Sequence, residues 1–349
     1  MNTTIDAFIS LVRAGLWEKD VQLLRYGKID YVKLLNIAEE QAVLGLVNVG
    51  LEHVSDVKVP QERVLQFIGN TLQIEQQNKA MNVFIAKLIA QMRKAGIYTL
   101  LVKGQGIAQC YEKPLWRTSG DVDLLLSDSN YQKAKEFLLP LSSGNKPDER
   151  YSKHLGMNIG EWYVEIHGTL RTGLSERVDR EVDAVQKDVF CGGKVRSWVN
   201  NGVHVFLPAP DEDVFFVFTH FIKHFYKEGM SLRQLCDWCR LLWTYRDSIV
   251  CELLEKRVRR AKLMDEWKVF AALAVEYLGM PAEAMPLYNK NEKFKKKTER
   301  LVEFILHGGS GNKVKDTYHI AKIFPWNTLR FLPGIFLNMN GLKIKERLF

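Results

Sequence analysis

The chain has 349 residues, of which 46% are hydrophobic, and this is enough for two or three packed units with ordinary globular cores. It has no run of about 18 apolar residues and no basic start followed by an apolar run, so we expect neither a membrane span nor a secretory signal. The formal net charge is +8, and residues 290–349 carry all of it, with 13 Lys and Arg against 5 Asp and Glu.

The first part of the chain is predicted to be helical. Apolar residues recur at helical spacing within residues 5–16, 30–51 and 61–96. The last of these segments is long, and Pro60 and Gly96 stand where a helix can begin and end. We therefore expect an N-terminal helical region over residues 1–95.

From residue 96 the pattern becomes that of a mixed sheet with helices. Short apolar or alternating runs predict strands over residues 97–102, 121–126, 151–159, 161–170, 194–199 and 203–208. A helix is expected over residues 127–141, with Ser127 or Asp128 as its cap. The fold class predicted for the chain is α+β, with this core over residues 96–208.

Helical periodicity returns beyond Pro210. Acidic residues open the segment 211–229, which favours a helix start, and residues 231–247 are expected to form the next helix. We expect a C-terminal helical region over residues 209–310. Residues 311–349 mix Pro, Gly, aromatic and basic residues and receive no firm assignment beyond a basic, aromatic tail.

The charge of residues 290–349 allows two interpretations. A basic segment attracts an anionic partner such as nucleic acid, anionic lipid or an acidic protein, and the segment would then be dispensable for metal binding elsewhere. Alternatively, the lysines around residues 291–300 form the solvated face of a helix. A nucleic-acid binder is less favoured, because no aromatic residues are interleaved regularly with these lysines.

Two aspartates open the strand predicted over residues 121–126. Side chains alternate along a strand, so Asp121 and Asp123 point to one face while the apolar residues between and after them point to the buried face. Two such carboxylates repel each other unless a cation or solvent lies between them. Hard oxygen ligands in this arrangement suit Mg²⁺ or Mn²⁺.

A third carboxylate lies further along the chain. Glu165 and His167 share one face of the strand predicted over residues 161–170. If that strand neighbours the aspartate strand, three carboxylates can hold two metal ions about 4 Å apart, which clamp the attacking and leaving oxygens of a phosphoryl transfer. The alternatives are a solvated glutamate on an edge strand and a packed or capping histidine.

A glycine turn joins the first predicted strand to a short helix. The turn consists of Lys103, Gly104, Gln105 and Gly106. Free backbone N–H groups at such a helix start can hold a phosphate, and the glycines permit its close approach. Neither a Walker loop nor a dinucleotide fingerprint is present. Arg117, before the aspartate strand, is a candidate for neutralising a phosphate or for pairing with a nearby carboxylate.

Two residue pairs in the helical region have the spacing of one helix face. His220 and His224 are four residues apart, and the interpretations are a zinc site, residues facing the active-site cleft, or structural packing. Arg233 and Asp237 have the same spacing and suggest an intrahelical ion pair of small energetic value.

The five cysteines are scattered and odd in number, which argues against a disulfide framework. Cys236 and Cys239 form a CxxC pair without a second ligand pair, so we expect core cysteines rather than a zinc site. This cysteine usage favours a reducing, cytoplasmic compartment.

The order of strand, glycine turn, short helix, aspartate strand and later acid resembles that of the polymerase-beta-type nucleotidyltransferase superfamily. More narrowly, residues 96–245 are similar to a bacterial family called the uncharacterised nucleotidyltransferases. The matching positions are Lys103, Gly104, Ala108, Tyr111, Pro114, Arg117, Gly120, Asp121, Asp123, Glu165 and His167.

The resemblance implies that Asp121, Asp123 and Glu165 hold Mg²⁺ or Mn²⁺ and that residues 103–106 hold the phosphates of an NTP such as ATP. The implied reaction moves an NMP to an unidentified acceptor hydroxyl or phosphate and releases pyrophosphate, with Glu165 as the base. The usual Gly-Ser pair of the superfamily is replaced by Lys103-Gly104-Gln105. The alternative is therefore a catalytically degenerate fold that acts as a nucleotide-binding or partner-binding module.

Overall fold

The computed structural model describes residues 3–143, 153–307 and 312–345. Within these residues a six-stranded mixed sheet has the order β3-β4-β2-β1-β6-β5. The strands are β1 (Thr99–Val102), β2 (Asp121–Leu126), β3 (His154–Ile159), β4 (Trp162–His167), β5 (Val195–Asn200) and β6 (Val203–Pro208). Each segment predicted to be a strand forms one, and the α+β class is confirmed.

The pairing of the strands places β2 near the middle of the sheet. It pairs antiparallel with β1 and parallel with β4. Two hairpins complete the sheet, one joining β3 to β4 and one joining β5 to β6, and β6 runs parallel to β1. The acids of β2 and β4 are therefore brought together by a parallel pairing between strands that are not consecutive in the chain.

Both faces of the sheet are covered by helices. Helices α4 (Gln61–Lys94) and α6 (Asp128–Leu138) pack on one face, in a cluster that contains Val122, Leu124 and Leu126 of β2. On the other face Leu125 joins a larger core that includes α8 (Pro210–Lys227). Burial on both faces explains why the second half of β2 is a continuous apolar run.

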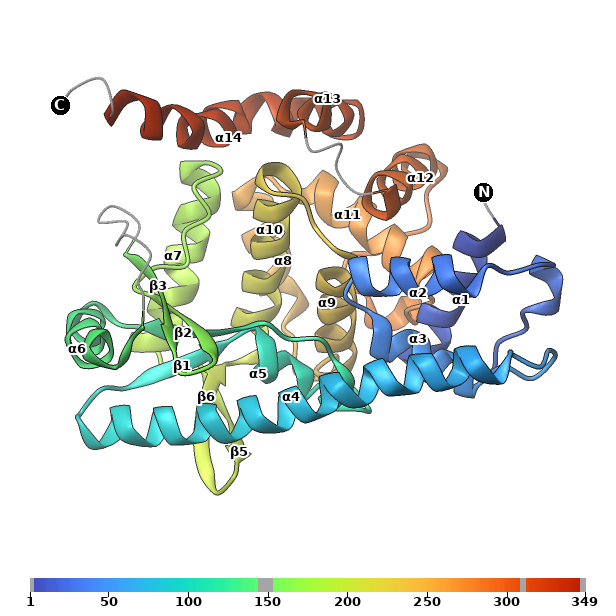
Figure 1. Ribbon diagram of the computed structural model, residues 1–349. Helices are drawn as coiled ribbons and strands as arrows, with labels where there is room; N and C mark the ends of the chain where they lie inside the picture. The colour runs from blue at the N-terminus through green and yellow to red at the C-terminus, as the bar shows by residue number, and fades with distance from the viewer. Residues whose placement is uncertain (1–2, 144–152, 308–311, 346–349) are drawn as a thin grey trace.

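The N-terminal helices lie beside the sheet rather than on it. They are α1 (Thr3–Trp17), α2 (Tyr31–Glu40) and α3 (Leu44–Glu52). Asp30 caps α2 by accepting hydrogen bonds from the backbone N–H groups of Val32 and Lys33. The long helix α4, with 34 residues, runs from these helices to the sheet, as Figure 1 shows. Its bounds confirm the helix expected between Pro60 and Gly96.

The C-terminal helices form the larger core together with α1 to α3. They are α7 (Glu176–Cys191), α8, α9 (Leu232–Thr244), α10 (Cys251–Ala261), α11 (Met264–Ala272), α12 (Glu292–His307), α13 (Lys313–Ile323) and α14 (Pro325–Lys345). A π-helical turn, Leu273–Tyr277, continues α11. The fully buried rings of Phe218, Trp238 and Trp267 pack against one another at the centre. Single-turn 3₁₀ helices occur at Leu24–Tyr26, Pro114–Trp116, Leu139–Leu141 and Ala282–Ala284, and the short helix α5 spans Gly104–Ala108.

The segment left unassigned in the sequence is helical over most of its described residues, 312–345. Helices α13 and α14 lie along one side of the molecule in Figure 1, next to the ends of α7 and α10. Ile320, Ile323, Phe324, Phe331 and Ile335 are buried in the larger core. Residues of this segment therefore belong to the folded body and are not a free appendage.

No helix within the described residues is both long enough and apolar enough to cross a membrane. All five cysteines are free, as expected. Cys236 and Cys239 are fully buried in α9, in keeping with a role in the core.

Candidate functional site

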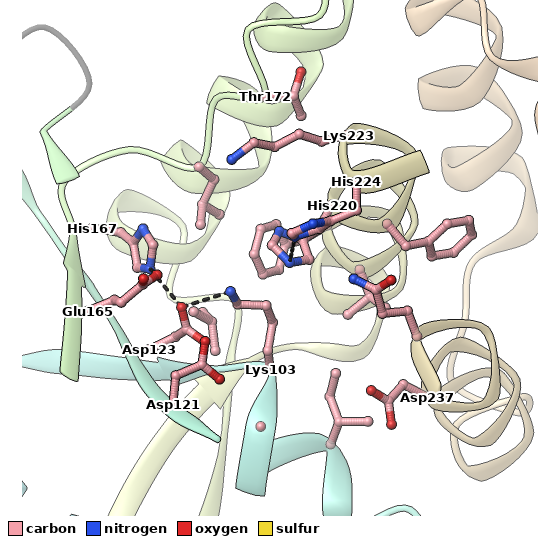
Figure 2. Close-up of a pocket in the computed structure, with 18 of the residues that line it drawn as sticks. Lys103, Asp121, Asp123, Glu165, His167, Thr172, His220, Lys223, His224 and Asp237 are labelled. Carbon is pink, nitrogen blue, oxygen red and sulfur yellow. Dashed lines mark hydrogen bonds and ion pairs between the residues drawn. The ribbon is translucent and has the colours of Figure 1, made fainter. Parts of the chain in front are cut away.

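Three carboxylates converge where β2 and β4 run side by side. The parallel register sets Asp123 opposite Glu165, and Asp121 lies two residues earlier on the same face of β2. Carboxylate oxygens of all three residues lie within 4.8 Å of one another. They line a cavity of about 360 Å³, shown in Figure 2, so the adjacency expected from the sequence is observed.

Asp123 is the most deeply buried of the three acids, at 2% exposure. Its Oδ1 is 2.7 Å from Nζ of Lys103 and 2.8 Å from Nε2 of His167. Burial alone would raise the pKa of Asp123, but the ammonium of Lys103 and the hydrogen bond to His167 outweigh it and hold the pKa well below its usual range. Asp123 is therefore an anion with Lys103 as its counter-ion.

Asp121 has a less favourable environment. Repulsion from Asp123 raises the pKa of Asp121, burial adds to the rise, and Lys103 opposes it. Lys103 is mostly buried, with 16% of its side chain exposed. Burial disfavours its charge, but the attraction of Asp123 and Asp121 outweighs burial and raises its pKa. One ammonium thus faces more than one carboxylate, which leaves an excess of negative charge at this end of the cavity.

Two histidines hold Glu165. Nε2 of His154 lies 3.1 Å and Nε2 of His167 lies 3.6 Å from Oε2 of Glu165. Burial favours a higher pKa for Glu165, but the hydrogen bond with His154 and the charge of His167 more than compensate, and the pKa is lowered. Burial lowers the pKa of His167, against the opposing effect of its bond to Asp123.

His154 was not anticipated from the sequence, although a signal was present. Gly160 and Glu161 form a two-residue connection between β3 and β4, and Gly160 has a positive φ of 60°. Such a tight hairpin fixes the register of its strands. Counting back from Ile159, which pairs with Trp162, places His154 opposite His167 and on the same face.

The glycine turn contributes two of its residues to the cavity. Lys103 and Gly104 both line it, and both have positive φ, 59° and 44°. Lys103 is neither Gly nor Asn, so this conformation is strained and is maintained by its surroundings, including the ion pair with Asp123. The strained turn directs the lysine toward the carboxylates.

The other two residues of the turn have structural contacts. Gln105 points away from the cavity and donates from Nε2 to Oδ1 of Asn78 on α4. A Cβ at Gly106 would lie 2.6 Å from the side chain of Leu207, so this glycine allows α5 to pack closely on β6. The N–H of Gly106 donates to the carbonyl of Lys103.

Arg117 has the carboxylate partner that the sequence analysis gave as its alternative. Its guanidinium donates from Nε and Nη2 to the two oxygens of Asp237, each at 2.7 Å, and from Nη1 to Ser119. Both charged residues are buried, and both line the cavity. The intrahelical pair expected between Arg233 and Asp237 is replaced by this contact, and Arg233 instead donates to the carbonyl of Thr118.

One face of α8 completes the cavity. His220 and His224 line it, and their Nε2 atoms are 3.0 Å apart. Nδ1 of His224 is 2.9 Å from Glu228, and this hydrogen bond lowers the pKa of Glu228 to about 2. Burial and the charge of Lys103 lower the pKa of His220 well below its usual value, so His220 is neutral. Among the described residues, no third metal ligand forms a cluster with these two histidines. Their place in the wall of the cavity agrees with the interpretation that they face the cleft.

Lys223 supplies a cation that sequence analysis missed. It lies on α8 three residues after His220, and Figure 2 shows its ammonium pointing into the cavity near Thr172. Lys223 and His224 follow His220 by three and four residues, so all three lie on one helix face. This spacing was the signal in the sequence that could have identified Lys223. The cavity therefore has carboxylates on the sheet and an ammonium on the facing helix.

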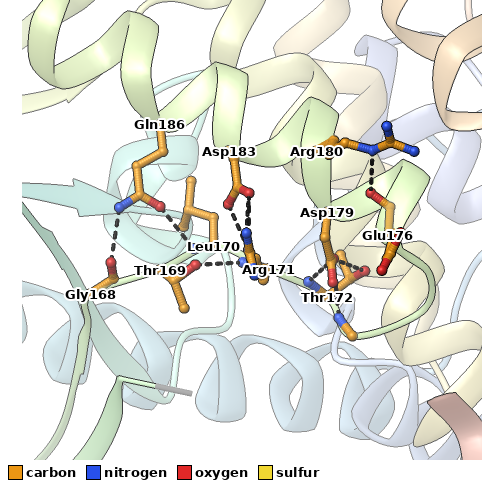
Figure 3. Close-up of polar contacts among 11 residues, drawn as sticks. Gly168, Thr169, Leu170, Arg171, Thr172, Glu176, Asp179, Arg180, Asp183 and Gln186 are labelled. Atoms are coloured by element: carbon orange, nitrogen blue, oxygen red, sulfur yellow. Dashed lines mark hydrogen bonds and ion pairs between the residues drawn. The ribbon is translucent and has the colours of Figure 1, made fainter. Parts of the chain in front are cut away.

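The loop after β4 forms the remaining wall, and α7 holds it in place (Figure 3). Asp179 accepts hydrogen bonds from the backbone N–H groups of Thr172 and Gly173. Gln186 accepts from the N–H of Leu170 and donates to the carbonyl of Gly168. These contacts explain how a connection without regular structure can be an ordered wall of the site.

Comparisons with known proteins find a family model and a solved structure that resemble the chain. A family model described as uncharacterised nucleotidyltransferase matches residues 27–279. No curated protein matches the chain. Among solved structures, an antigenic nucleotidyltransferase-like protein from Paracoccidioides brasiliensis aligns with a TM-score of 0.35 and 11% identity, over 57% of this chain and 92% of that chain.

Proposed function

The chain belongs to the uncharacterised nucleotidyltransferase family, and from that premise we propose that it transfers an NMP from an NTP, such as ATP, to an acceptor hydroxyl or phosphate. Pyrophosphate is the leaving group. The observation that carries the proposal is the convergence of Asp121, Asp123 and Glu165, whose ligand oxygens lie within 4.8 Å of one another in a cavity large enough for a nucleotide.

The three acids fit Mg²⁺ or Mn²⁺. All of them offer carboxylate oxygens, the ligands that hard divalent cations prefer. Repulsion from Asp123, which raises the pKa of Asp121, supports the proposal that a cation lies between the carboxylates. When bound, the metal would stabilise the charge that develops on the phosphate oxygens.

We propose that Lys103 and Gly104 are the residues of the glycine turn that bind phosphate. The ammonium of Lys103 contacts Asp123, and the backbone of Gly104 lines the same cavity. A small rotation about the flexible lysine side chain exchanges the carboxylate for a phosphate oxygen. Arg117, held by Asp237, is better placed to position the loop before β2 than to leave its buried partner.

Glu165 is the proposed base for the acceptor. His154 and His167 contact the same carboxylate oxygen, and the lowered pKa of Glu165 keeps it ionised and able to accept a proton. Lys223, on the facing helix, is the residue we assign to orienting an anionic part of either substrate.

Thermal unfolding with added Mn²⁺ and NTP tests whether the site binds its ligands. The parent should gain melting temperature with both ligands, because binding to the folded state alone stabilises it. Asp121→Asn should lose most of this gain, whereas the control Asp247→Asn, at an exposed position next to Arg246, should keep it. A folded parent that gains nothing would favour the catalytically degenerate module instead.

A further inference from the structure

A second group of metal-ligand atoms lies beside the three carboxylates. Nε2 of His154 and Nε2 of His167 lie 3.1 Å and 3.6 Å from the same oxygen of Glu165. One ligand atom from each of the three residues lies within 4.8 Å of the other two. We propose that His154, Glu165 and His167 form a site for a divalent transition-metal ion, distinct in ligand chemistry from the all-carboxylate site.

The separations of the two imidazole nitrogens from Glu165 fit one shared ion. Metal–ligand bonds of about 2.0–2.1 Å in a tetrahedral arrangement place neighbouring ligand atoms about 3.4 Å apart. The two distances from Glu165 lie on either side of that value. The rings of His154 and His167 are stacked, with centroids 4.7 Å apart, so both imidazoles approach the glutamate from the same side.

The backbone fixes this arrangement. His154 and His167 are directly paired across the β3–β4 hairpin, and Glu165 lies two residues from His167 on the same face. The residue opposite Glu165 is Gly156, which has no side chain to separate His154 from the glutamate. Ligands that come from two paired strands need little reorganisation to bind an ion.

The ligand types select the class of metal. Two imidazoles and one carboxylate favour Zn²⁺, Co²⁺ and related transition ions, whereas Mg²⁺ binds mainly through oxygen and retains water. Nε2 of His167 lies 2.8 Å from Oδ1 of Asp123. When His167 binds a metal ion instead, Asp123 becomes available to the ion of the neighbouring carboxylate site. Three protein ligands leave a coordination position open to the cavity, which all three residues line.

The inference shares Glu165 with the proposed function, but it does not depend on nucleotidyl transfer. Asp121 belongs only to the carboxylate group, and His154 belongs only to the histidine group. The two residues therefore give variants that separate the sites. His154 has a partly exposed side chain, so its substitution by Gln should leave the fold intact.

Cobalt titration of the full-length protein, in excess Mg²⁺, tests the site. The parent should bind one Co²⁺ with the intense visible absorption of low-coordinate cobalt, and His154→Gln should weaken this binding by at least about tenfold. His204→Gln, at an exposed position on β6, is the matched control and should bind as the parent does. Asp121→Asn should keep the cobalt spectrum while it loses Mn²⁺ binding.

Several results would overturn the inference. They are displacement of Co²⁺ by Mg²⁺, the weak spectrum of hydrated cobalt, or equal cobalt affinity in the parent and His154→Gln. If Asp121→Asn still abolished the response to Mn²⁺ and NTP in that case, the proposed function would survive the loss of the histidine site. If the parent bound cobalt at the histidine site but showed no response to Mn²⁺ and NTP, the histidine site would stand and the proposed function would fail.

Discussion

Asp121 and Asp123 stand two residues apart on one strand, but the contacts around them differ. Asp123 is buried and has both Lys103 and His167 as partners, whereas the pKa of Asp121 is raised mainly by repulsion from Asp123. The similar size of Asn suggests that either substitution would leave packing intact. The contacts predict opposite effects on stability, because Asp123 is in direct contact with the mostly buried ammonium of Lys103, whereas Asp121 is raised in energy by its neighbour Asp123.

In the metal-free protein, Asp123→Asn should lower the free energy of unfolding by about 3 kcal/mol, since it leaves Lys103 buried without its nearest anion. Asp121→Asn should raise it, by up to about 1 kcal/mol, because it removes a repelling charge. Urea unfolding of both variants in the presence of a chelator measures the difference. Equal destabilisation by the two substitutions would contradict this assignment of partners.

Strand parity predicted the two halves of the carboxylate group but not that they meet. Side-chain alternation alone put Asp121 with Asp123 and Glu165 with His167, and the structure supplies the pairing of β2 with β4. The partner of Arg117 could not be predicted, because Asp237 is distant in sequence and the helical spacing rule indicated Arg233 instead. Local spacing identifies candidates, but tertiary contacts decide which carboxylate a buried arginine meets.

Helices α1 and α3 approach each other through glycines. A Cβ at Gly50 would lie 2.2 Å from the carbonyl oxygen of Leu11, and one at Gly15 would lie 2.0 Å from that of Leu46. Both obstacles are backbone atoms, which cannot rotate away as a side chain can. The two helices can therefore pack at this distance only without side chains at these positions.

Gly50→Ala should destabilise the protein by about 1–3 kcal/mol, because overpacking forces the two helices apart. Gly69→Ala is the matched control in α4, where a Cβ would meet nothing within 4 Å. That change should stabilise by about 0.5–1 kcal/mol through helix propensity. Chemical denaturation of both variants gives the comparison, and a neutral Gly50→Ala would show that the helices can separate at no cost.

Helices with strong periodicity and clear end signals were predictable, and those without them were not. Pro60 and Gly96 bracket α4 closely. In contrast, α14 contains Pro333 inside the helix and mixes aromatic, polar and glycine residues, so its pattern lacks a clear period. The helix α14 is fixed by contacts with distant parts of the chain. For example, a Cβ at Gly334 would lie 2.3 Å from the carbonyl oxygen of Gly173, in the loop that follows β4.

At the scale of the whole molecule, the basic C-terminal region combines two roles. The exposed lysines of α12 lie opposite its buried residues Phe294, Thr298 and Leu301, an arrangement that both a solvated helix face and an anionic partner allow. Helices α13 and α14 add buried side chains to the core that also contains α1 and α8. The surface charge and the structural contribution therefore come from different residues.

Removal of residues 312–349 should prevent stable folding. It would remove the buried side chains of Ile320, Ile323, Phe324, Phe331 and Ile335 and expose the core residues that they cover. At about 2 kcal/mol for each large apolar side chain, the loss is comparable to the whole stability of a protein. Circular dichroism during heating should show a much lower transition or none. A truncated chain that melts like the parent and binds Mn²⁺ would support the expectation of a dispensable tail.

The most direct test of the central claim is transfer of label from α-³²P-labelled NTPs, with Mn²⁺ and a cell extract as the source of acceptor. The parent and the control Asp247→Asn should label a discrete acceptor with at least one NTP. Asp121→Asn should reduce the rate by a factor of about a thousand or more, because the stabilisation of charge at the phosphate is lost. Equal labelling by Asp121→Asn and the parent, or no labelling by a folded parent that binds Mn²⁺ and NTP, would contradict the account.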